Sequence, residues 1–145
     1  MSRGRAALHR SPVIVLLQIA GAGLLLAMAG IHFYLWLDQG YRDIPTIGPL
    51  FLANTVGGTV LAVAVLVSPK RYFALVALLS TLFDAGTLGA LLVSLSSNLL
   101  FNFQESIQAP LVPTTLWVEG AGVLVLAVLT VFALRARSRS TDTDD

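Results

Sequence analysis

The sequence predicts an all-α fold in which four transmembrane helices form an up-down bundle with both termini in the cytoplasm. The first observation is composition: 56% of the 145 residues are hydrophobic and only 12% are charged, whereas soluble domains have roughly 45–50% and about 25%. So few charges cannot cover this much apolar surface in water, and a large part of that surface must therefore face lipid. The second observation is four long apolar runs separated by polar segments. The third is the one-sided distribution of lysine and arginine along the chain.

The apolar runs define four predicted spans. The first covers residues 12–37, and Pro12 suits the first turn of a helix, where a backbone N–H is not needed. The others are predicted at residues 49–67, 72–97 and 113–134. Runs of this length can cross roughly 30 Å of hydrocarbon as helices. They form one membrane domain, residues 12–134, between a basic tail at 1–11 and a disordered cytoplasmic tail at 135–145.

A competing interpretation treats the N-terminal region as a cleaved signal peptide. The basic start, the apolar run and the sequence Ala27-Met28-Ala29 fit a small-residue cleavage pattern. The apolar run continues beyond this pattern as far as Leu37, which favours a retained first span. The sequence alone leaves the question of cleavage open.

Lysine and arginine predict the orientation. Of the nine such residues, all but Arg42 lie in the two tails or in the second loop, which carries Lys70 and Arg71. Positive charge is retained on the cytoplasmic side of a membrane. Both termini are therefore predicted inside, with the first and third loops outside.

Several classes of site are excluded or unsupported. The chain has no cysteine, which excludes disulfides, thiolate metal sites and cysteine nucleophiles. His9 lies in the predicted tail, so a bis-histidine haem site within the spans is excluded. The sequence contains no serine elbow, phosphate loop or HExxH motif. We expect no metal, no cofactor and no nucleic-acid partner, and we assign no catalytic residue; whether the protein is an enzyme stays open.

Four polar residues inside the spans form the candidate site. His32, Asn54 and Glu119 lie at similar depth, within roughly 10 Å of the outer surface at 1.5 Å per helical residue, and Asp84 lies near the middle of the third span. Ionisable groups within spans usually face the bundle interior. We expect a pocket beneath the first loop, with His32, Asn54 and Glu119 as its lining and Asp84 as its floor. Purely structural roles are the alternative: hydrogen bonding for His32, Asn54 and Asp84, and a hydrated or protonated, inert acid for Glu119.

The first loop is the candidate cap of this pocket. It is rich in turn-forming residues and also carries apolar residues, so we expect it to fold back onto the bundle, with Ile44 and Ile47 toward the core. Arg42 is expected to close over the pocket and pair with Glu119 or Asp84. A purely structural cap and a lid over a ligand are equally compatible with this pattern. The candidate cap residues are Tyr41, Arg42, Pro45, Thr46 and Gly48.

Small residues recur four positions apart in the predicted spans. Such pairs let helix backbones approach closely in lipid. Packing within the chain is the simpler interpretation, and a face for self-association is the alternative. The pairs are Gly23 and Ala27, Ala53 and Gly57, Gly58 and Ala62, and Ala85 and Gly89.

The segment HFYLWLDQGYRDIPTIGPLFLANTVGG, residues 32–58, resembles a group of uncharacterised four-span integral membrane proteins of actinobacterial type. In these proteins a GYRxIPTIGxLFL segment joins an aromatic-rich first helix to an asparagine-containing second helix. The resemblance covers the first half of the chain. It implies a four-span fold in a bacterial cytoplasmic membrane and no particular activity. A more distant likeness is to the DoxX-like four-helix membrane proteins, some of which are linked to quinone-dependent respiration.

Three functions follow as hypotheses, in this order. The first is an accessory or interaction subunit of a larger membrane complex, because the chain is small and lacks a catalytic constellation. The second is a small homo-oligomeric, proton-coupled transporter, because Asp84 and Glu119 lie within spans. The third is a quinone-associated or redox membrane subunit, with His32 and Arg42 near the outer surface. The expected partners are the lipid bilayer and either another membrane protein or a second copy of this chain.

Overall fold

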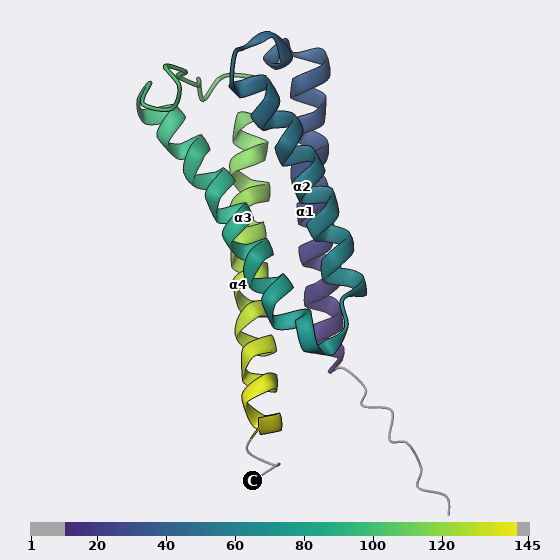
Figure 1. Cartoon of the computed structure of the whole chain (residues 1–145). Coiled ribbons are helices and arrows are strands. Elements are labelled where there is room, and N and C mark those ends of the chain that lie inside the picture. The colour runs from purple at the N-terminus through teal and green to yellow at the C-terminus, as the bar shows by residue number, and fades with distance from the viewer. Residues whose placement is uncertain (1–10, 142–145) are drawn as a thin grey trace, which may run out of the picture.

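The computed structural model describes residues 11–141 and is helical almost throughout (Figure 1). Helix α1 covers Pro12–Asp38 and is followed by a short 3₁₀ helix, η1, at Tyr41–Asp43. Helices α2 and α3 cover Ile47–Val67 and Lys70–Ser96, and α4 covers Val112–Thr141. All four α-helices are long and apolar enough to cross a membrane. The fold is therefore all-helical, as predicted, and fits a multi-pass membrane protein.

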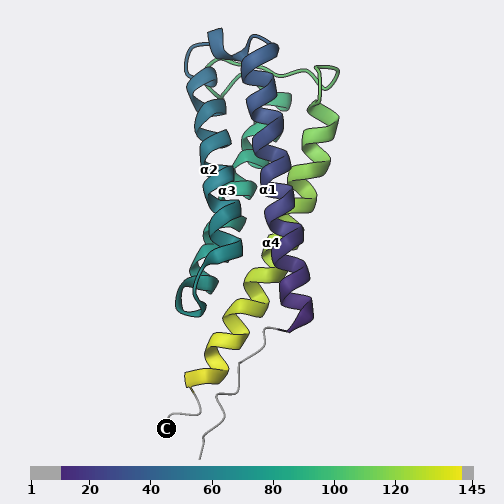
Figure 2. The same ribbon diagram turned by 90° about the vertical axis from the view of Figure 1, so that its right-hand side faces the viewer.

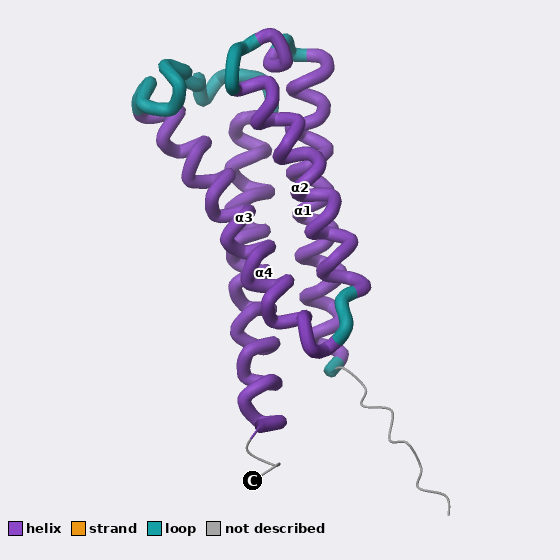
Figure 3. The backbone as a smooth tube through the Cα atoms, viewed as in Figure 1, coloured by secondary structure: helices purple, strands orange, loops and turns teal. Residues whose placement is uncertain are grey.

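The helices run alternately up and down. The start of α1, the turn between α2 and α3 and the end of α4 lie at one end of the bundle, which we call the terminal end (Figure 1). The α1–α2 and α3–α4 connections lie together at the other end, the loop end, where Figure 3 shows most of the described loop segments. Helix α1 packs against α2 and α4, and α3 packs against α4 and α2. Figure 2 shows α4 inclined across α1.

The bundle buries small and aliphatic side chains and leaves large aliphatic ones on its outside. The main core cluster includes Leu25, Met28, Leu126 and Leu129, all fully buried. Large apolar side chains such as Leu124 remain outside, 70% exposed. An apolar exterior of this kind suits lipid and not water.

Polar side chains join the helices within the span region. Gln18 donates from Nε2 to the carbonyl oxygen of Val65 at 2.8 Å, which links α1 to α2. The hydroxyls of Thr81 and Thr130 lie 3.0 Å apart and link α3 to α4. Interhelical hydrogen bonds of this type stabilise membrane bundles.

The predicted boundaries need one correction. Helices α2 and α3 begin at Ile47 and Lys70, close to the predicted residues 49 and 72. The predicted disordered tail from residue 135 is wrong for residues 135–141, which continue α4 to Thr141. The arginines in this segment end the apolar run, but arginine and alanine are strong helix formers. The predictions for residues 1–10 and 142–145 lie outside the described residues.

Candidate functional site

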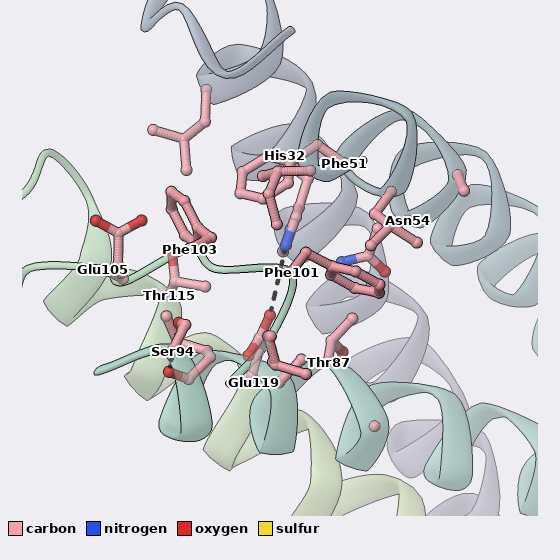
Figure 4. Close-up of a pocket in the computed structure, with 18 of the residues that line it drawn as sticks. His32, Phe51, Asn54, Thr87, Ser94, Phe101, Phe103, Glu105, Thr115 and Glu119 are labelled. Atoms are coloured by element: carbon pink, nitrogen blue, oxygen red, sulfur yellow. Dashed lines mark hydrogen bonds and ion pairs between the residues drawn. The ribbon is translucent and has the colours of Figure 1, made fainter. Parts of the chain in front are cut away.

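A pocket of about 470 Å³ lies in the loop-end half of the bundle (Figure 4). All four α-helices contribute to it, and so does the α3–α4 loop. Its wall is mostly apolar and includes three aromatic rings near the polar groups, those of Phe51, Phe101 and Phe103. Its lining from α1, α2 and α4 is His32, Leu35, Ile47, Leu50, Phe51, Ala53, Asn54, Val112, Thr115 and Glu119; from α3 and the loop it is Leu82, Phe83, Gly86, Thr87, Ala90, Leu91, Ser94, Leu100, Phe101, Phe103 and Glu105.

The pocket is buried on one side and open on the other. Its lining residues on α1 and α4, such as Leu35 and Val112, are buried. Its exposed lining residues lie on α2, α3 and the α3–α4 loop, among them Leu50 at 46% and Leu82 at 60%. The α2 and α3 ribbons diverge toward the loop end (Figure 1). The mouth therefore lies between α2 and α3, at a depth where the outside of the bundle is apolar.

Phe83 and Gly57 close the α2–α3 interface on the terminal side of the pocket. A Cβ at Gly57 would lie 2.8 Å from Cζ of Phe83, so the aromatic ring rests directly on the glycine. Nearer the loop end, the facing residues Ala53, Gly86 and Ala90 have little or no side chain. A Cβ at Gly86 would meet nothing within 4 Å. Small residues at the mouth thus leave space that large side chains would fill.

His32 is held in α1 with one ring nitrogen occupied and the other directed at the pocket. Nδ1 lies 3.0 Å from the carbonyl oxygen of Met28, one turn earlier, and donates to it. The ring packs against Phe51, with centroids 4.9 Å apart and planes at 55°. Nε2 faces Oε1 of Glu119 at 3.9 Å, and Figure 4 shows the two side chains pointing toward each other. The sequence prediction brought these two residues together correctly.

Glu119 is the most deeply buried acid of the pocket lining. Its residue is 1% exposed, and neither carboxyl oxygen has a hydrogen-bond partner within the described structure. One turn earlier on α4, the hydroxyl of Thr115 is already bonded to the carbonyl oxygen of Leu111. A buried carboxyl group with no such partner is costly unless a proton or a cation compensates it.

Asp84 lies beside this pocket and does not line it. It is 1% exposed, and its Oδ1 has no hydrogen-bond partner among the described groups. Its other carboxyl oxygen, Oδ2, packs directly against Gly122 of α4, one turn beyond Glu119. This contact places the Asp84 carboxyl group on the same stretch of α4 as Glu119. Asp84 was predicted to form the floor of the pocket, but it lies behind Glu119, within the α3–α4 interface.

Asn54 lines the pocket from α2, as predicted. It is 6% exposed, and its Oδ1 has no hydrogen-bond partner among the described residues. Figure 4 shows its amide beside Phe101. The alternative for Asn54 was a structural hydrogen bond to a neighbouring helix, and residues 11–141 contain no such bond from its side chain.

The first loop folds onto the bundle as predicted, with Ile47 buried and Ile44 packed beside it. Tyr41 is the centre of this contact. Its ring stacks on Phe51, with centroids 4.7 Å apart, and its hydroxyl donates to Oε2 of Glu105 at 2.7 Å. Burial raises the pKa of the Tyr41 phenol above its ordinary value, and the bond to Glu105 raises it further.

The other predicted cap residues take different positions. The predicted pairing of Arg42 with Glu119 or Asp84 is wrong, because the Arg42 side chain is 52% exposed and its Nε lies 3.8 Å from Asp43 in the same loop. A guanidinium at the surface stays hydrated, whereas burial beside the acids would strip its water. Pro45 is exposed, and Thr46, also exposed, precedes α2 with φ of 67°. Gly48 is buried against the backbone of Arg42.

Sequence reasoning missed the contribution of the α3–α4 loop. Phe101, Phe103 and Glu105 line the pocket, and Glu105 also anchors the first loop through Tyr41. The signal was present: this segment carries Leu99, Leu100, Phe101 and Phe103 in a loop that was otherwise interpreted as polar. Within residues 11–141, no group of three or more His, Cys, Asp or Glu side chains is placed to hold a metal ion.

Comparisons with known proteins leave the chain without an assigned family. No protein-family model matches it, and searches of curated proteins and of solved structures find no match either. The resemblance to four-span actinobacterial proteins and the distant DoxX-like likeness stay predictions. The pocket is therefore the feature from which function can be inferred.

Proposed function

We propose that this protein binds an amphipathic, bilayer-resident small molecule in the pocket beneath its loops, and that the molecule reaches the pocket from the lipid between α2 and α3. The observation that carries this proposal is the contrast between the buried side of the pocket and its open side. Buried polar groups, His32, Asn54 and Glu119, lie within it, and small or apolar residues line the open side. Ligand sites are typically apolar cavities of about 300–1,000 Å³ with a few polar groups that orient the ligand.

This arrangement favours a carrier or a ligand-binding membrane protein over a purely structural subunit. A helix that only packs against a partner needs no internal cavity, and an empty apolar cavity loses dispersion contacts. The unpartnered oxygens of Asn54 and Glu119 are an additional cost in a protein that never binds a ligand. An accessory role within a larger membrane complex stays a prediction from the sequence.

Photoaffinity labelling in nanodiscs tests the proposal. The probe is a long-chain alcohol that carries a diazirine, and peptide mass spectrometry locates the labelled residues. We expect labelling to concentrate on pocket residues of α2 and α3, such as Leu50 and Leu82. Labelling spread evenly over the outward-facing residues of all four helices would contradict a specific site.

Two glycines of α3 provide a matched pair of variants. Gly86 lines the pocket and Gly89 does not, and a Cβ at either position would meet nothing within 4 Å. Gly86→Leu places an isobutyl group at the mouth, so we expect it to suppress labelling of the pocket. Gly89→Leu adds the same group outside the pocket and should leave the labelling unchanged.

A further inference from the structure

We propose that the ligand is a lipophilic monovalent cation and that it exchanges for a proton at the carboxyl pair Glu119 and Asp84. This inference rests on the proposed function, because it names the class of ligand that the same pocket binds. It starts from three ionisable groups inside the bundle. Glu119 lies 3.9 Å from His32, and Asp84 packs against Gly122, one turn along α4 from Glu119.

Counting charge shows what the cluster lacks. Helix α1 contributes His32, α3 contributes Asp84 and α4 contributes Glu119; α2 contributes the neutral Asn54. The other acid of the lining, Glu105 in the α3–α4 loop, is only half-buried and already accepts hydrogen bonds from the Tyr41 hydroxyl and the Ser106 backbone N–H. Even with a protonated imidazole, two ionised carboxylates leave one negative charge uncompensated. The arginine predicted to supply the missing charge, Arg42, pairs with Asp43 at the surface instead. An unpaired buried charge is prohibitively costly in a medium of low dielectric constant.

One proton or one monovalent cation restores neutrality, and the two therefore compete. When the cation arrives, one proton leaves, so the charge inside the bundle is unchanged. Glu119 is suited to this exchange because it lines the pocket and neither of its oxygens has a hydrogen-bond partner among the described groups. Asp84 lies behind it and shares the negative charge without contacting the pocket.

The pocket wall suits an organic cation better than a metal ion. The aromatic rings of Phe101 and Phe103 line the pocket beside its polar groups (Figure 4). The faces of such rings attract ammonium groups, by about 0.5–2 kcal/mol depending on desolvation. A small inorganic cation would need several oxygen ligands, whereas most of this lining is apolar. A tertiary or quaternary amine with an apolar body matches both features.

The test uses two probes of the same shape. Benzyltrimethylammonium carries the positive charge, and neopentylbenzene replaces its nitrogen by carbon. Both compete against the diazirine alcohol in nanodiscs. We expect the cation to displace the alcohol at concentrations at least about tenfold lower, which corresponds to about 1.4 kcal/mol. Equal or better displacement by the neutral hydrocarbon would overturn the inference and leave the proposed function intact, whereas absence of pocket labelling by the alcohol would overturn both.

The pH dependence gives a second, independent measurement. Protons compete with the cation, so its apparent affinity should fall as pH falls, by up to about tenfold per pH unit where one proton is displaced. Displacement by neopentylbenzene should not vary with pH. A cation affinity that is constant between pH 5 and 9 would contradict the exchange of a proton.

Three variants separate charge from folding. Glu119→Gln removes the buried acid that lines the pocket, so it should lose the preference for the cation and its pH dependence. Asp84→Asn leaves Glu119 in place to bind either the cation or a proton, so it should weaken the preference without removing it. Displacement by neopentylbenzene reports whether each variant still folds with an intact pocket. His32→Gln keeps both acids and should retain the preference for the cation. Full retention of that preference in Glu119→Gln would contradict the proposal.

Discussion

Replacing Gly48 by alanine is expected to destabilise the protein even though alanine favours helices. Gly48 lies in the first turn of α2, where η1 and the loop fold back across the helix. A Cβ at this position would lie 2.6 Å from the carbonyl oxygen of Arg42 and 2.9 Å from its carbonyl carbon and Cα. These atoms are backbone, so no rotation of a side chain can relieve the overlap. Either the loop or the start of the helix must move.

The magnitude follows from two opposing terms. Inserting a methyl group into a filled space typically costs about 1–3 kcal/mol, and the rigid backbone of Arg42 places this site in the upper part of that range. Alanine in place of glycine within a helix returns up to about 1 kcal/mol. We therefore expect Gly48→Ala to lower the free energy of unfolding by about 1–2 kcal/mol.

Gly120→Ala is the matched control, because a Cβ there would meet nothing within 4 Å. It should be neutral or stabilising by up to about 1 kcal/mol. Both variants can be unfolded by SDS titration from mild detergent micelles, with helix content followed by circular dichroism. If Gly48→Ala proves as stable as Gly120→Ala, the close approach between the loop and α2 does not exist as described.

Two further contacts yield testable expectations. Tyr41→Phe removes the hydrogen bond to Glu105 and should cost about 0.5–1.5 kcal/mol, measured by SDS unfolding, with faster hydrogen exchange in residues 97–111. The pKa of Tyr41 is raised in the folded state, so its contribution to the free energy of unfolding should be fully present below the unfolded pKa of about 10 and lost as pH rises above it. Between pH 8 and pH 11 the free energy of unfolding should therefore fall more for the parent protein than for Tyr41→Phe. Gln18→Met removes the bond to Val65 and should cost about 0.6 kcal/mol, and a gain in stability would show that this bond contributes nothing.

Hydropathy was sufficient to predict the four spans, because in lipid the length of an apolar run and the length of a helix coincide. It failed at the end of α4, where Arg135 ends the apolar run but the helix continues to Thr141. Residues beyond the hydrocarbon region need not be apolar, but their intrinsic helix propensity still favours continuing the helix. The side of the membrane on which each end lies stays a prediction from the lysine and arginine distribution.

The meeting of His32 and Glu119 was predictable because both lie at similar depth on helices and polar groups turn inward in lipid. The position of Asp84 behind Glu119 was not, because it depends on the close approach of α3 and α4 at Gly122. The conformation of the α3–α4 loop was equally inaccessible. Phe101 and Asn102 both have positive φ, 54° and 56°, a backbone region that sequence pattern does not predict for a phenylalanine.

The pocket and the charge imbalance are produced by different parts of the sequence, and their coincidence is the strongest argument for a ligand. The opening depends on Ala53, Gly86 and Ala90, whose short side chains do not fill the space between α2 and α3 on the loop-end side of Phe83. Burial of Glu119 depends instead on α4 facing the interior. A bundle under selection for stability alone would fill the opening between α2 and α3 with larger side chains. It would also replace Glu119 by an apolar residue, since either change lowers the free energy of the folded state. The opening and the buried Glu119 can coexist at low energetic cost when a bound molecule fills the opening with its apolar body and compensates Glu119 with its positive charge.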